Sequence, residues 1–215
     1  MRPNRTGECG VAHPPAGNPG FAKPFWAWAI VEVLRATGIR VEQLLELSHH
    51  SVVKHRLPTT GEVVPLLQIV PSKTDAERLL VVSPELADVL SAIIRRVRDQ
   101  TGAVPLVAAY DGHEHVWAPP APLLFQRIVA NEHRAFASST VRDLLAGALA
   151  HTGLVDHDDG QPLDYTPHDF RRMFITDAIM NGLPPHIAQV IAGHRDINVT
   201  LGYKGGHVGT DGSVS

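Results

Sequence analysis

The sequence predicts an α+β fold that is mainly helical and contains a small antiparallel sheet. Two observations support this prediction. Several segments repeat apolar residues at helical spacing, among them residues 25–36, 84–100 and 167–179. Two short apolar runs, residues 62–70 and 78–82, flank a turn in the way that a β-hairpin requires. Local strand pairing between longer helices is typical of a mixed fold with a helical majority.

The first half of the chain is expected to contain two helices before the hairpin. Residues 25–36 are strongly apolar and end before Gly38, which predicts a buried helix. Residues 41–47 form a second helical face, so the turn at Gly38 places Arg40 at the start of that helix. After the hairpin, Ser83 and Pro84 are the cap and first residue of a third helix.

The second half begins with residues 103–136, whose short apolar pieces indicate strands and loops in an order that stays open. A helix is predicted over 139–154, followed by an acidic exposed loop. Thr166 caps the next helix and Pro167 begins it. The last helix opens at Pro184-Pro185 and ends at Gly193, and we expect a buried stripe on it formed by Ile187, Val190 and Ile191.

The two ends differ in composition from the middle of the chain. Residues 1–24 are rich in Gly and Pro and lack an apolar period, which predicts a disordered leader. Residues 205–215 are Gly-rich and polar, which predicts a disordered tail. One folded domain is therefore expected over residues 25–204.

Composition places the chain among soluble globular proteins, with 44% apolar and 19% charged residues in a length of 215. It has no apolar run long enough to span a bilayer and no signal segment, so we expect a cytoplasmic protein without a membrane partner. The single cysteine, Cys9, excludes an internal disulfide and a cysteine-based zinc site.

The net charge of −3 argues mildly against a nucleic-acid binder. The acidity is concentrated in residues 111–160, which carry three Lys or Arg against seven Asp or Glu. If the protein binds DNA, a local face must make the contact.

The stretch Thr166–Tyr203 carries the residues with the clearest chemical meaning. His168 and Arg171 are three positions apart on a predicted helix, so they share a face and can reach one common anion. His194 follows the helix-ending Gly193, and Tyr203 is a candidate nucleophile nine positions further on.

Two upstream residues extend this group to six. Arg40 lies in the motif TGIR, and Lys73 lies at the predicted hairpin turn. In this order the six residues resemble the catalytic set of the tyrosine recombinases, the phage-integrase-like enzymes, with a colinear match from Phe25 to Tyr203. The catalytic set that the resemblance implies is Arg40, Lys73, His168, Arg171, His194 and Tyr203.

The resemblance implies a tyrosine-recombinase-like catalytic domain that cuts and rejoins DNA strands through a 3′-phosphotyrosine intermediate, without cofactor or metal. The implied partner is double-stranded DNA, bound by a homo-tetramer. Members of the family normally have a DNA-clamping domain before the catalytic domain and a further helix after the tyrosine. We expect both to be missing here, which would weaken assembly and make the chain a truncated copy.

The chain departs from the family pattern at three positions outside the set. Gln43 stands where an acidic residue is usual, Ser51 where Asp is frequent, and Arg172 where His is frequent. These differences concern residues that support the six and leave the six themselves intact.

Two alternative functions stay open. A type IB topoisomerase-like nicking and closing enzyme would use similar groups, and a catalytically idle fragment would bind DNA or a partner without cutting. Each member of the set also has an ordinary structural interpretation, such as a turn lysine for Lys73 or a surface tyrosine for Tyr203. The pairs His49-His50 and His113-x-His115 have no carboxylate or cysteine at a convincing ligand spacing, so no metal site is predicted.

Overall fold

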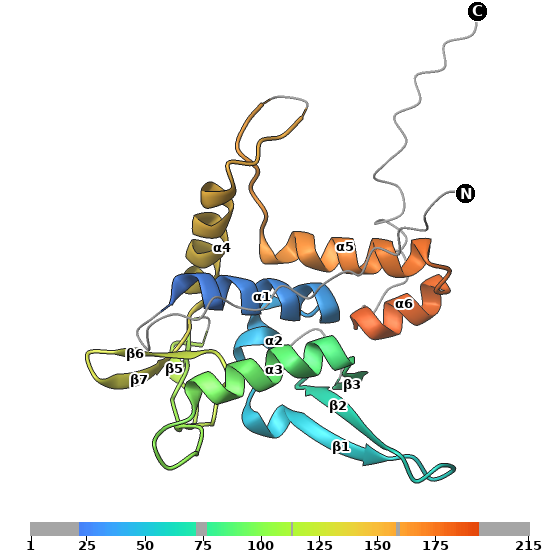
Figure 1. Ribbon diagram of the computed structural model, residues 1–215, viewed down its shortest axis with the longest axis horizontal. Coiled ribbons are helices and arrows are strands. Elements are labelled where there is room, and N and C mark those ends of the chain that lie inside the picture. The colour runs from blue at the N-terminus through green and yellow to red at the C-terminus, as the bar shows by residue number, and fades with distance from the viewer. Residues whose placement is uncertain (1–21, 72–76, 113, 158–159, 194–215) are drawn as a thin grey trace, which may run out of the picture.

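The computed structural model describes residues 22–71, 77–112, 114–157 and 160–193. It is mainly helical with small antiparallel sheets, as predicted (Figure 1). No helix in these ranges is both long and apolar enough to cross a membrane. The expected leader and tail lie outside the described residues. The elements are α1 (Lys23–Thr37), α2 (Val41–Leu45), η1 (His49–Ser51), β1 (Val52–Arg56), β2 (Val63–Ile69), β3 (Arg78–Val81), α3 (Pro84–Val97), β4 (Tyr110–Asp111), β5 (Val116–Trp117), β6 (Gln126–Val129), β7 (Glu132–Ala135), α4 (Ser138–Thr152), α5 (Pro167–Met180) and α6 (Pro185–Ala192).

Helix α1 is the centre of the fold. It lies between α3 and α5 and also packs against α4 (Figure 1). Because neighbours surround it, apolar residues on nearly all sides of α1 are buried, including Ile30, Val33 and Leu34 with no exposed surface. Near its start, the ring of Trp26 lies 4.9 Å from that of Phe136, which joins α1 to the segment after β7. The predicted buried helix is confirmed.

Three antiparallel strands form a sheet in the order β1-β2-β3. The pairing of β2 with β3 confirms the predicted hairpin, whose connecting residues 72–76 lie outside the described ranges. Leu67 and Ile69 are buried on the face that meets the helices, whereas Leu79 and Val81 are exposed on the opposite face. Strand β1 was not predicted, because its second half, from Lys54 to Arg56, is polar and exposed.

Residues 103–136 form two hairpins, β4–β5 and β6–β7. A buried amide anchors the second one: Gln126 Nε2 donates to the carbonyl oxygens of Pro105 at 3.0 Å and Leu123 at 2.6 Å. Its Oε1 lies 2.9 Å from His133 Nδ1. These hydrogen bonds join polar groups of loops and strands, and such contacts leave no apolar period in the sequence. The order of the strands in this segment therefore could not be predicted.

The predicted cap at the start of α3 and the predicted glycines after α1, α4 and α6 are confirmed, whereas α3 ends at Val97, before the expected residue 100. Ser83 Oγ accepts a hydrogen bond from the Leu86 backbone N–H at 3.2 Å, which is the expected N-cap of α3. Gly38, Gly153 and Gly193 each adopt a left-handed conformation after the last residue of α1, α4 and α6, respectively.

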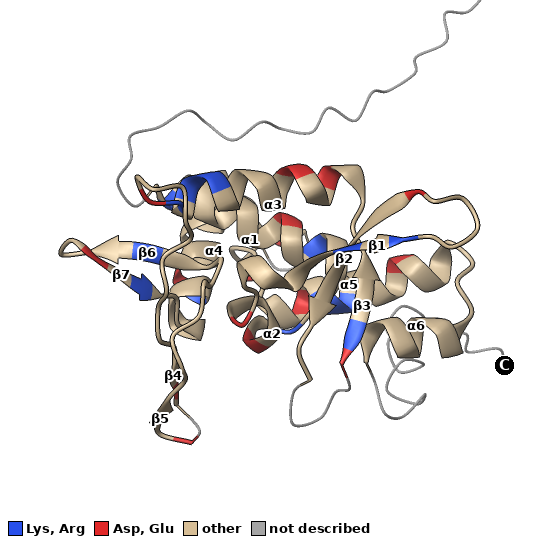
Figure 2. Ribbon diagram, turned by 90° about the horizontal axis from the view of Figure 1, so that it is seen from below, with Lys and Arg blue, Asp and Glu red and all other residues tan. Residues whose placement is uncertain are grey.

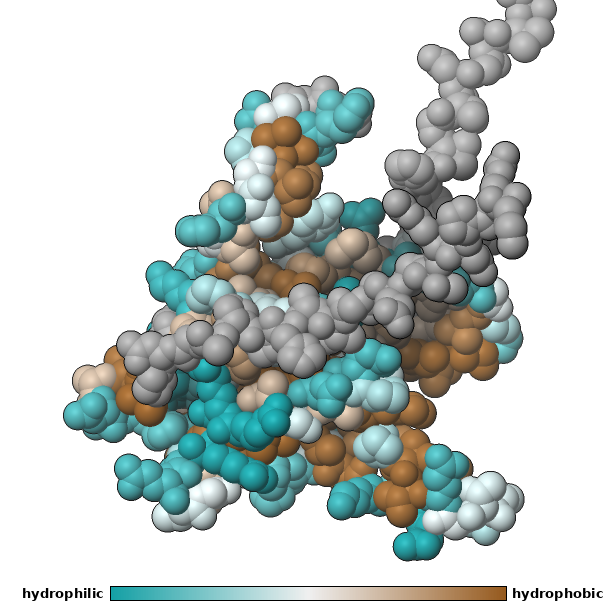
Figure 3. All heavy atoms as spheres, viewed as in Figure 1, coloured by the Kyte–Doolittle hydropathy of each residue, from teal (hydrophilic) through white to brown (hydrophobic). Residues whose placement is uncertain are grey.

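The buried stripe predicted on α6 is wrong. Val190 is 68% exposed and Ile187 39%, and Ile191 is only partly buried, whereas Ala188 and Ala192 are buried. The small side chains of Ala188 and Ala192 form the buried side of α6, so its larger apolar residues face outward. Figure 3 shows this apolar surface over α6, and a second one along the arm between α4 and α5, where Leu154 and Val155 are exposed.

Candidate active site

Three of the six predicted site residues lie in the described part of the chain: Arg40, His168 and Arg171. Lys73, His194 and Tyr203 lie outside it; Lys73 lies between the described residues 71 and 77, and His194 directly follows the last described residue, Gly193.

Arg171 is the most deeply buried cation of the described chain, with 2% of its surface exposed. It extends from the second turn of α5 toward the ends of two other helices. Its Nη1 donates to the Gly38 carbonyl oxygen at 2.7 Å, and its Nη2 donates to the Ala192 carbonyl oxygen. Gly38 ends α1 and Ala192 is the last residue of α6. Helix C-termini carry partial negative charge and carbonyls without intrahelical donors, so a guanidinium at this point is stabilised although it is buried.

These two bonds bring distant motifs together. Gly38 precedes Arg40 by two residues, and Ala192 precedes His194 by two residues. The bond to Gly38 spans 133 positions of sequence. Arg171 therefore holds the segment just before Arg40 next to the segment just before His194.

Gly38 permits this contact through its conformation and its lack of a side chain. Its φ of +59° is in the left-handed region, where glycine has no steric penalty. A Cβ atom built on Gly38 would lie 2.4 Å from Cδ1 of Phe174, which is one turn after Arg171 on α5. The backbone at the end of α1 thus rests directly against the Phe174 ring.

Arg40 is the residue that precedes the first turn of α2. Its extended backbone, with φ −76° and ψ 158°, ends the Gly38 turn and starts the helix. The Arg40 backbone N–H donates to Gln43 Oε1 at 3.2 Å. Gln43 is 1% exposed, so this bond lies in the protein interior. The expected position of Arg40 at a helix start is confirmed.

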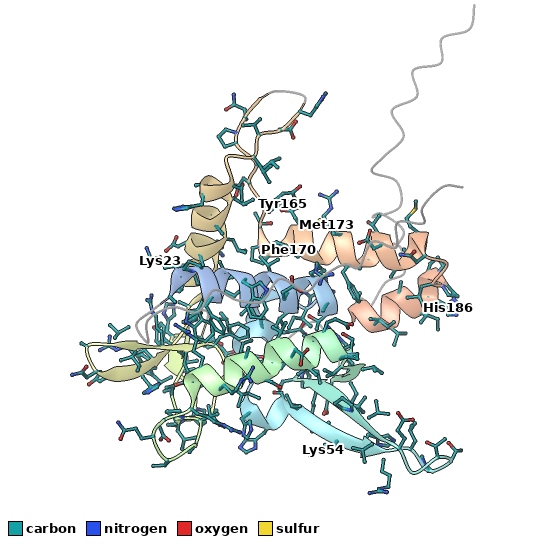
Figure 4. The ribbon with its side chains drawn as sticks, viewed as in Figure 1. Lys23, Lys54, Tyr165, Phe170, Met173 and His186 are labelled. Atoms are coloured by element: carbon teal, nitrogen blue, oxygen red, sulfur yellow. The ribbon has the colours of Figure 1, made fainter. Side chains whose placement is uncertain are left out.

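His168 lies in the first turn of α5 and is exposed, one turn before Arg171. The helical spacing of the two residues is as predicted, but their surroundings differ, because Arg171 turns inward to the helix ends. Beside them, Phe170 packs between α5 and α1, with the Tyr165 ring 6.3 Å from it (Figure 4).

Hydrogen bonds between Thr166 and Asp169 fix the start of α5, and the sequence revealed them only in part. The Thr166 backbone N–H donates to Asp169 Oδ2 at 3.0 Å, and the Thr166 hydroxyl donates to the same oxygen at 2.7 Å. Burial alone would raise the pKa of Asp169, but these hydrogen bonds and the charges of Arg172 and His168 outweigh it and lower the pKa. The spacing T-x-x-D before an apolar helix is the signal for this arrangement.

We expect Asp169→Asn to destabilise the protein by about 0.5–2 kcal/mol at pH 7, because it weakens the cap of α5. A carboxyl with a lowered folded-state pKa stabilises the fold above its unfolded pKa of about 3.9, and this contribution disappears as the pH falls through the folded value. Urea unfolding from pH 7 down to pH 3 should show the difference between variant and wild type shrinking. Asp164→Asn removes an equal charge from an exposed loop position and should leave stability within about 0.5 kcal/mol; a deficit as large as that of Asp169→Asn would contradict the assignment.

Charge is unevenly distributed around the site. Figure 2 shows Lys and Arg on β1 and β3 and acidic residues on α2. Partial burial raises the pKa of the Glu46 carboxyl, and the charges of Glu42 and Asp111 raise it further. A polyanion approaching α2 from its acidic side would be repelled, whereas the exposed Lys54 and Arg56 of β1 would attract it.

Other basic residues serve packing. Arg96 near the end of α3 places its guanidinium carbon 4.5 Å from the centre of the Phe25 ring. Among the residues that the structure describes, no three His, Cys, Asp or Glu side chains gather where they could hold a metal ion.

The roles of Gly38 and Phe174 as residues that shape the site could not be predicted from the sequence. The glycine was visible only as a helix terminator, and the phenylalanine only as one of the apolar residues at helical spacing within 167–179. Their contact links residues far apart in sequence, so no local pattern could indicate it.

Comparison with known proteins identifies the relatives of this chain. A model of the phage integrase family matches residues 18–206. The tyrosine recombinase XerD of Lacticaseibacillus casei is 27% identical over 177 residues, which cover 81% of this chain and 48% of the relative.

Solved structures show the same fold. The Tn1549 transposon integrase in complex with transposon right end DNA superposes with a TM-score of 0.57 at 19% identity, over 85% of this chain and 55% of that one. A lambda integrase dimer bound to a core site gives a TM-score of 0.56 at 16% identity, over 92% of this chain and 58% of that one. The chain thus spans about half the length of the relatives that it matches.

Proposed function

Because the chain belongs to the phage integrase family of tyrosine recombinases, we propose that it cleaves and rejoins DNA strands through a covalent 3′-phosphotyrosine intermediate. The observation that best supports the proposal is the pair of hydrogen bonds from Arg171 to Gly38 and Ala192. These bonds draw together the segments that lead to Arg40 and His194. The helix from which Arg171 extends, α5, also carries His168.

The proposed nucleophile is Tyr203. Its phenolic oxygen forms a bond to the phosphorus of a DNA phosphodiester, and the bond from phosphorus to the 5′ oxygen breaks. Lys73 is the proposed acid that gives a proton to the departing 5′ oxygen. The attack of a 5′ hydroxyl on the phosphotyrosine reverses these steps, so the broken strand is rejoined without an external energy source.

Arg40 and Arg171 are proposed to stabilise the charge that develops on the two non-bridging oxygens. A guanidinium is planar, always charged and offers five N–H donors in a fixed geometry. Such fixed donors are worth most where solvent is excluded, which suits the burial of Arg171. His168 and His194 are proposed to donate hydrogen bonds to the phosphate or to move the Tyr203 proton, since imidazole titrates near neutral pH.

The proposed substrate is double-stranded DNA. The solved relatives include integrases bound to DNA, as their descriptions state. In this chain the exposed Lys54 and Arg56 lie on β1, which follows α2 and η1 in the chain, so a duplex lying along β1 would run toward the segment that carries Arg40. This side also avoids the acidic residues around Glu46.

The test is the covalent intermediate itself. We expect the protein to form an adduct that survives denaturation when it is incubated with nicked duplexes drawn from a genomic library, because a nick next to the cleaved bond lets the leaving strand diffuse away. Tyr203→Phe should abolish the adduct, since only the nucleophilic oxygen is removed. Adduct formation that is undiminished in Tyr203→Phe would overturn the assignment, and no adduct with any duplex would indicate an idle fragment. Relaxed plasmid without exchanged strands would instead indicate a nicking and closing enzyme.

A further inference from the structure

The β4–β5 hairpin exposes two large aromatic side chains. Tyr110 and Trp117 are directly paired across the two strands, so their side chains lie on the same face, with the ring centres 5.2 Å apart. Trp117 is 69% exposed and Tyr110 is 50% exposed. The Tyr110 hydroxyl lies 3.1 Å from His115 Nδ1, which brings a third ring beside the pair. In Figure 2 the hairpin projects from the rest of the protein, so its aromatic face is accessible to a partner.

The aromatic pair has the character of a contact surface and not of a core. A hairpin of two strands is at best marginally stable by itself, and its exposed rings gain little from burial within this chain. Tyrosine and tryptophan are also enriched at protein interfaces, where they contribute a large share of the binding free energy. A partner that covers Tyr110 and Trp117 would bury apolar surface that the fold leaves in water.

The surroundings of the pair are negatively charged. Residues 99–126 contain three acidic residues and no Lys or Arg. Two of the three, Asp111 and Glu114, are exposed in the hairpin itself. Partial burial raises the pKa of the Glu46 carboxyl, and Glu42 and Asp111 raise it further, so the negative charge of α2 lies within electrostatic reach of the hairpin. DNA phosphates would be repelled from this surface, whereas a cation would be attracted to it.

We propose that Tyr110 and Trp117 form a docking site for a cationic segment of a partner protein, with an arginine or lysine side chain over the exposed indole ring. The face of an aromatic ring attracts a cation within about 6 Å of its centre, and tryptophan does so most strongly. The carboxylates of Asp111 and Glu114 on the same hairpin favour the approach of positive charge. DNA and the cationic segment would use surfaces of opposite charge, so the docking site does not depend on the proposed cleavage.

The first test uses a tetra-arginine amide peptide as the probe and follows the three tryptophan indole N–H signals of the full chain by NMR. We expect the Trp117 signal to shift, while the signals of the buried Trp26 and the partly buried Trp28 stay in place. A tetra-citrulline amide peptide is the matched control, since its side chains have nearly the same shape but no charge, and it should leave the Trp117 signal unchanged. An arginine peptide that does not move the Trp117 signal would overturn the proposal.

The second test removes the rings. Trp117→Leu and Tyr110→Leu each keep an apolar side chain but lose the aromatic face, so each should weaken binding of the arginine peptide by about two- to fivefold. The double variant should weaken binding by about 5–25-fold, measured from the shifts of the hairpin amides. Val81→Ala is the control, because it shortens another exposed apolar side chain, 72% exposed on β3, and should leave the affinity unchanged. Urea unfolding would show that the variants fold. Equal affinity of the folded double variant and the wild type would refute the role of the rings.

Other occupants of the site give different results. A short DNA duplex should not move the Trp117 signal, and a shift with DNA but not with the arginine peptide would contradict the proposal. A second copy of this chain could supply the cation from its exposed Lys54 or Arg56. Sedimentation equilibrium of the wild type and of Trp117→Leu tests this alternative: self-association that the substitution abolishes would identify the second copy as the occupant and would rule out the assignment to a different protein.

Discussion

Arg171→Ala is expected to abolish adduct formation and to destabilise the fold. The substitution removes the donor from two buried carbonyls, those of Gly38 and Ala192. At about 1–3 kcal/mol for each buried group left without a partner, the free energy of unfolding should fall by roughly 2–6 kcal/mol. The rate of adduct formation should fall by at least about 10²-fold, the typical effect of losing one donor to a transition-state oxygen.

Arg171→Lys should recover little of either loss, because an ammonium is a single point of charge and cannot match the geometry of a guanidinium that faces two helix ends. The control is Arg172→Ala. Arg172 is the adjacent residue, exposed, with its Nη1 only within 3.9 Å of Asp169, so its removal should change stability by less than about 1 kcal/mol. Urea unfolding would measure both variants. Equal stability of Arg171→Ala and Arg172→Ala would show that the two carbonyl bonds contribute little.

Gly38→Ala should destabilise the protein strongly, because the added methyl group meets both an unfavourable backbone conformation and a neighbouring ring. A left-handed backbone costs a non-glycine residue about 1–2 kcal/mol. The new Cβ would also overlap Phe174, 2.4 Å from Cδ1 and 2.7 Å from Cγ, and overpacking of a core costs about 1–3 kcal/mol more. We expect a total loss of about 2–5 kcal/mol, measured by urea unfolding. Because the Phe174 contact lies beside the Arg171 bond, adduct formation should fall as well.

Gly153 offers a matched control within the same chain. It ends α4 with φ +65° and ψ 15°, close to the φ +59° and ψ 19° of Gly38, but nothing lies within 4 Å of its added Cβ. Gly153→Ala should therefore show the backbone cost alone, about 1–2 kcal/mol. Adding Phe174→Ala to Gly38→Ala should relieve the overlap, so the double variant should lose less than the sum of the two single losses. Equal losses in Gly38→Ala and Gly153→Ala would mean that the ring moves away freely.

Most helices and their ends could be predicted from the sequence, because their signals are local. Glycine after the last apolar residue marks the ends of α1, α4 and α6, and proline marks the starts of α3, α5 and α6. The β2–β3 hairpin was equally visible as two apolar runs around a turn. By contrast, β1 has a polar, exposed second half and gave no such signal.

The apolar pattern of α6 predicted the wrong face, because it records which residues are apolar and not which of them touch another element. Because alanines form the buried side of α6, Val190 is left exposed to solvent. The candidate site shows a similar limit. Motifs of three or four residues identified Arg40, His168 and Arg171, but the partners of Arg171 are backbone carbonyls, which have no sequence signature. Only the fold reveals them.

The central place of α1 also affects how the protein is made. Synthesis at about 5–20 residues per second means that Gly38 precedes Arg171, 133 positions later, by roughly 7–27 seconds. During that time α1, with its buried Trp26, Ile30 and Leu34, gains α3 and then α4 but still lacks α5, which packs against it in the finished protein. A nascent chain arrested before α5 should therefore bind chaperones strongly, and its release should coincide with the emergence of α5 from the ribosome.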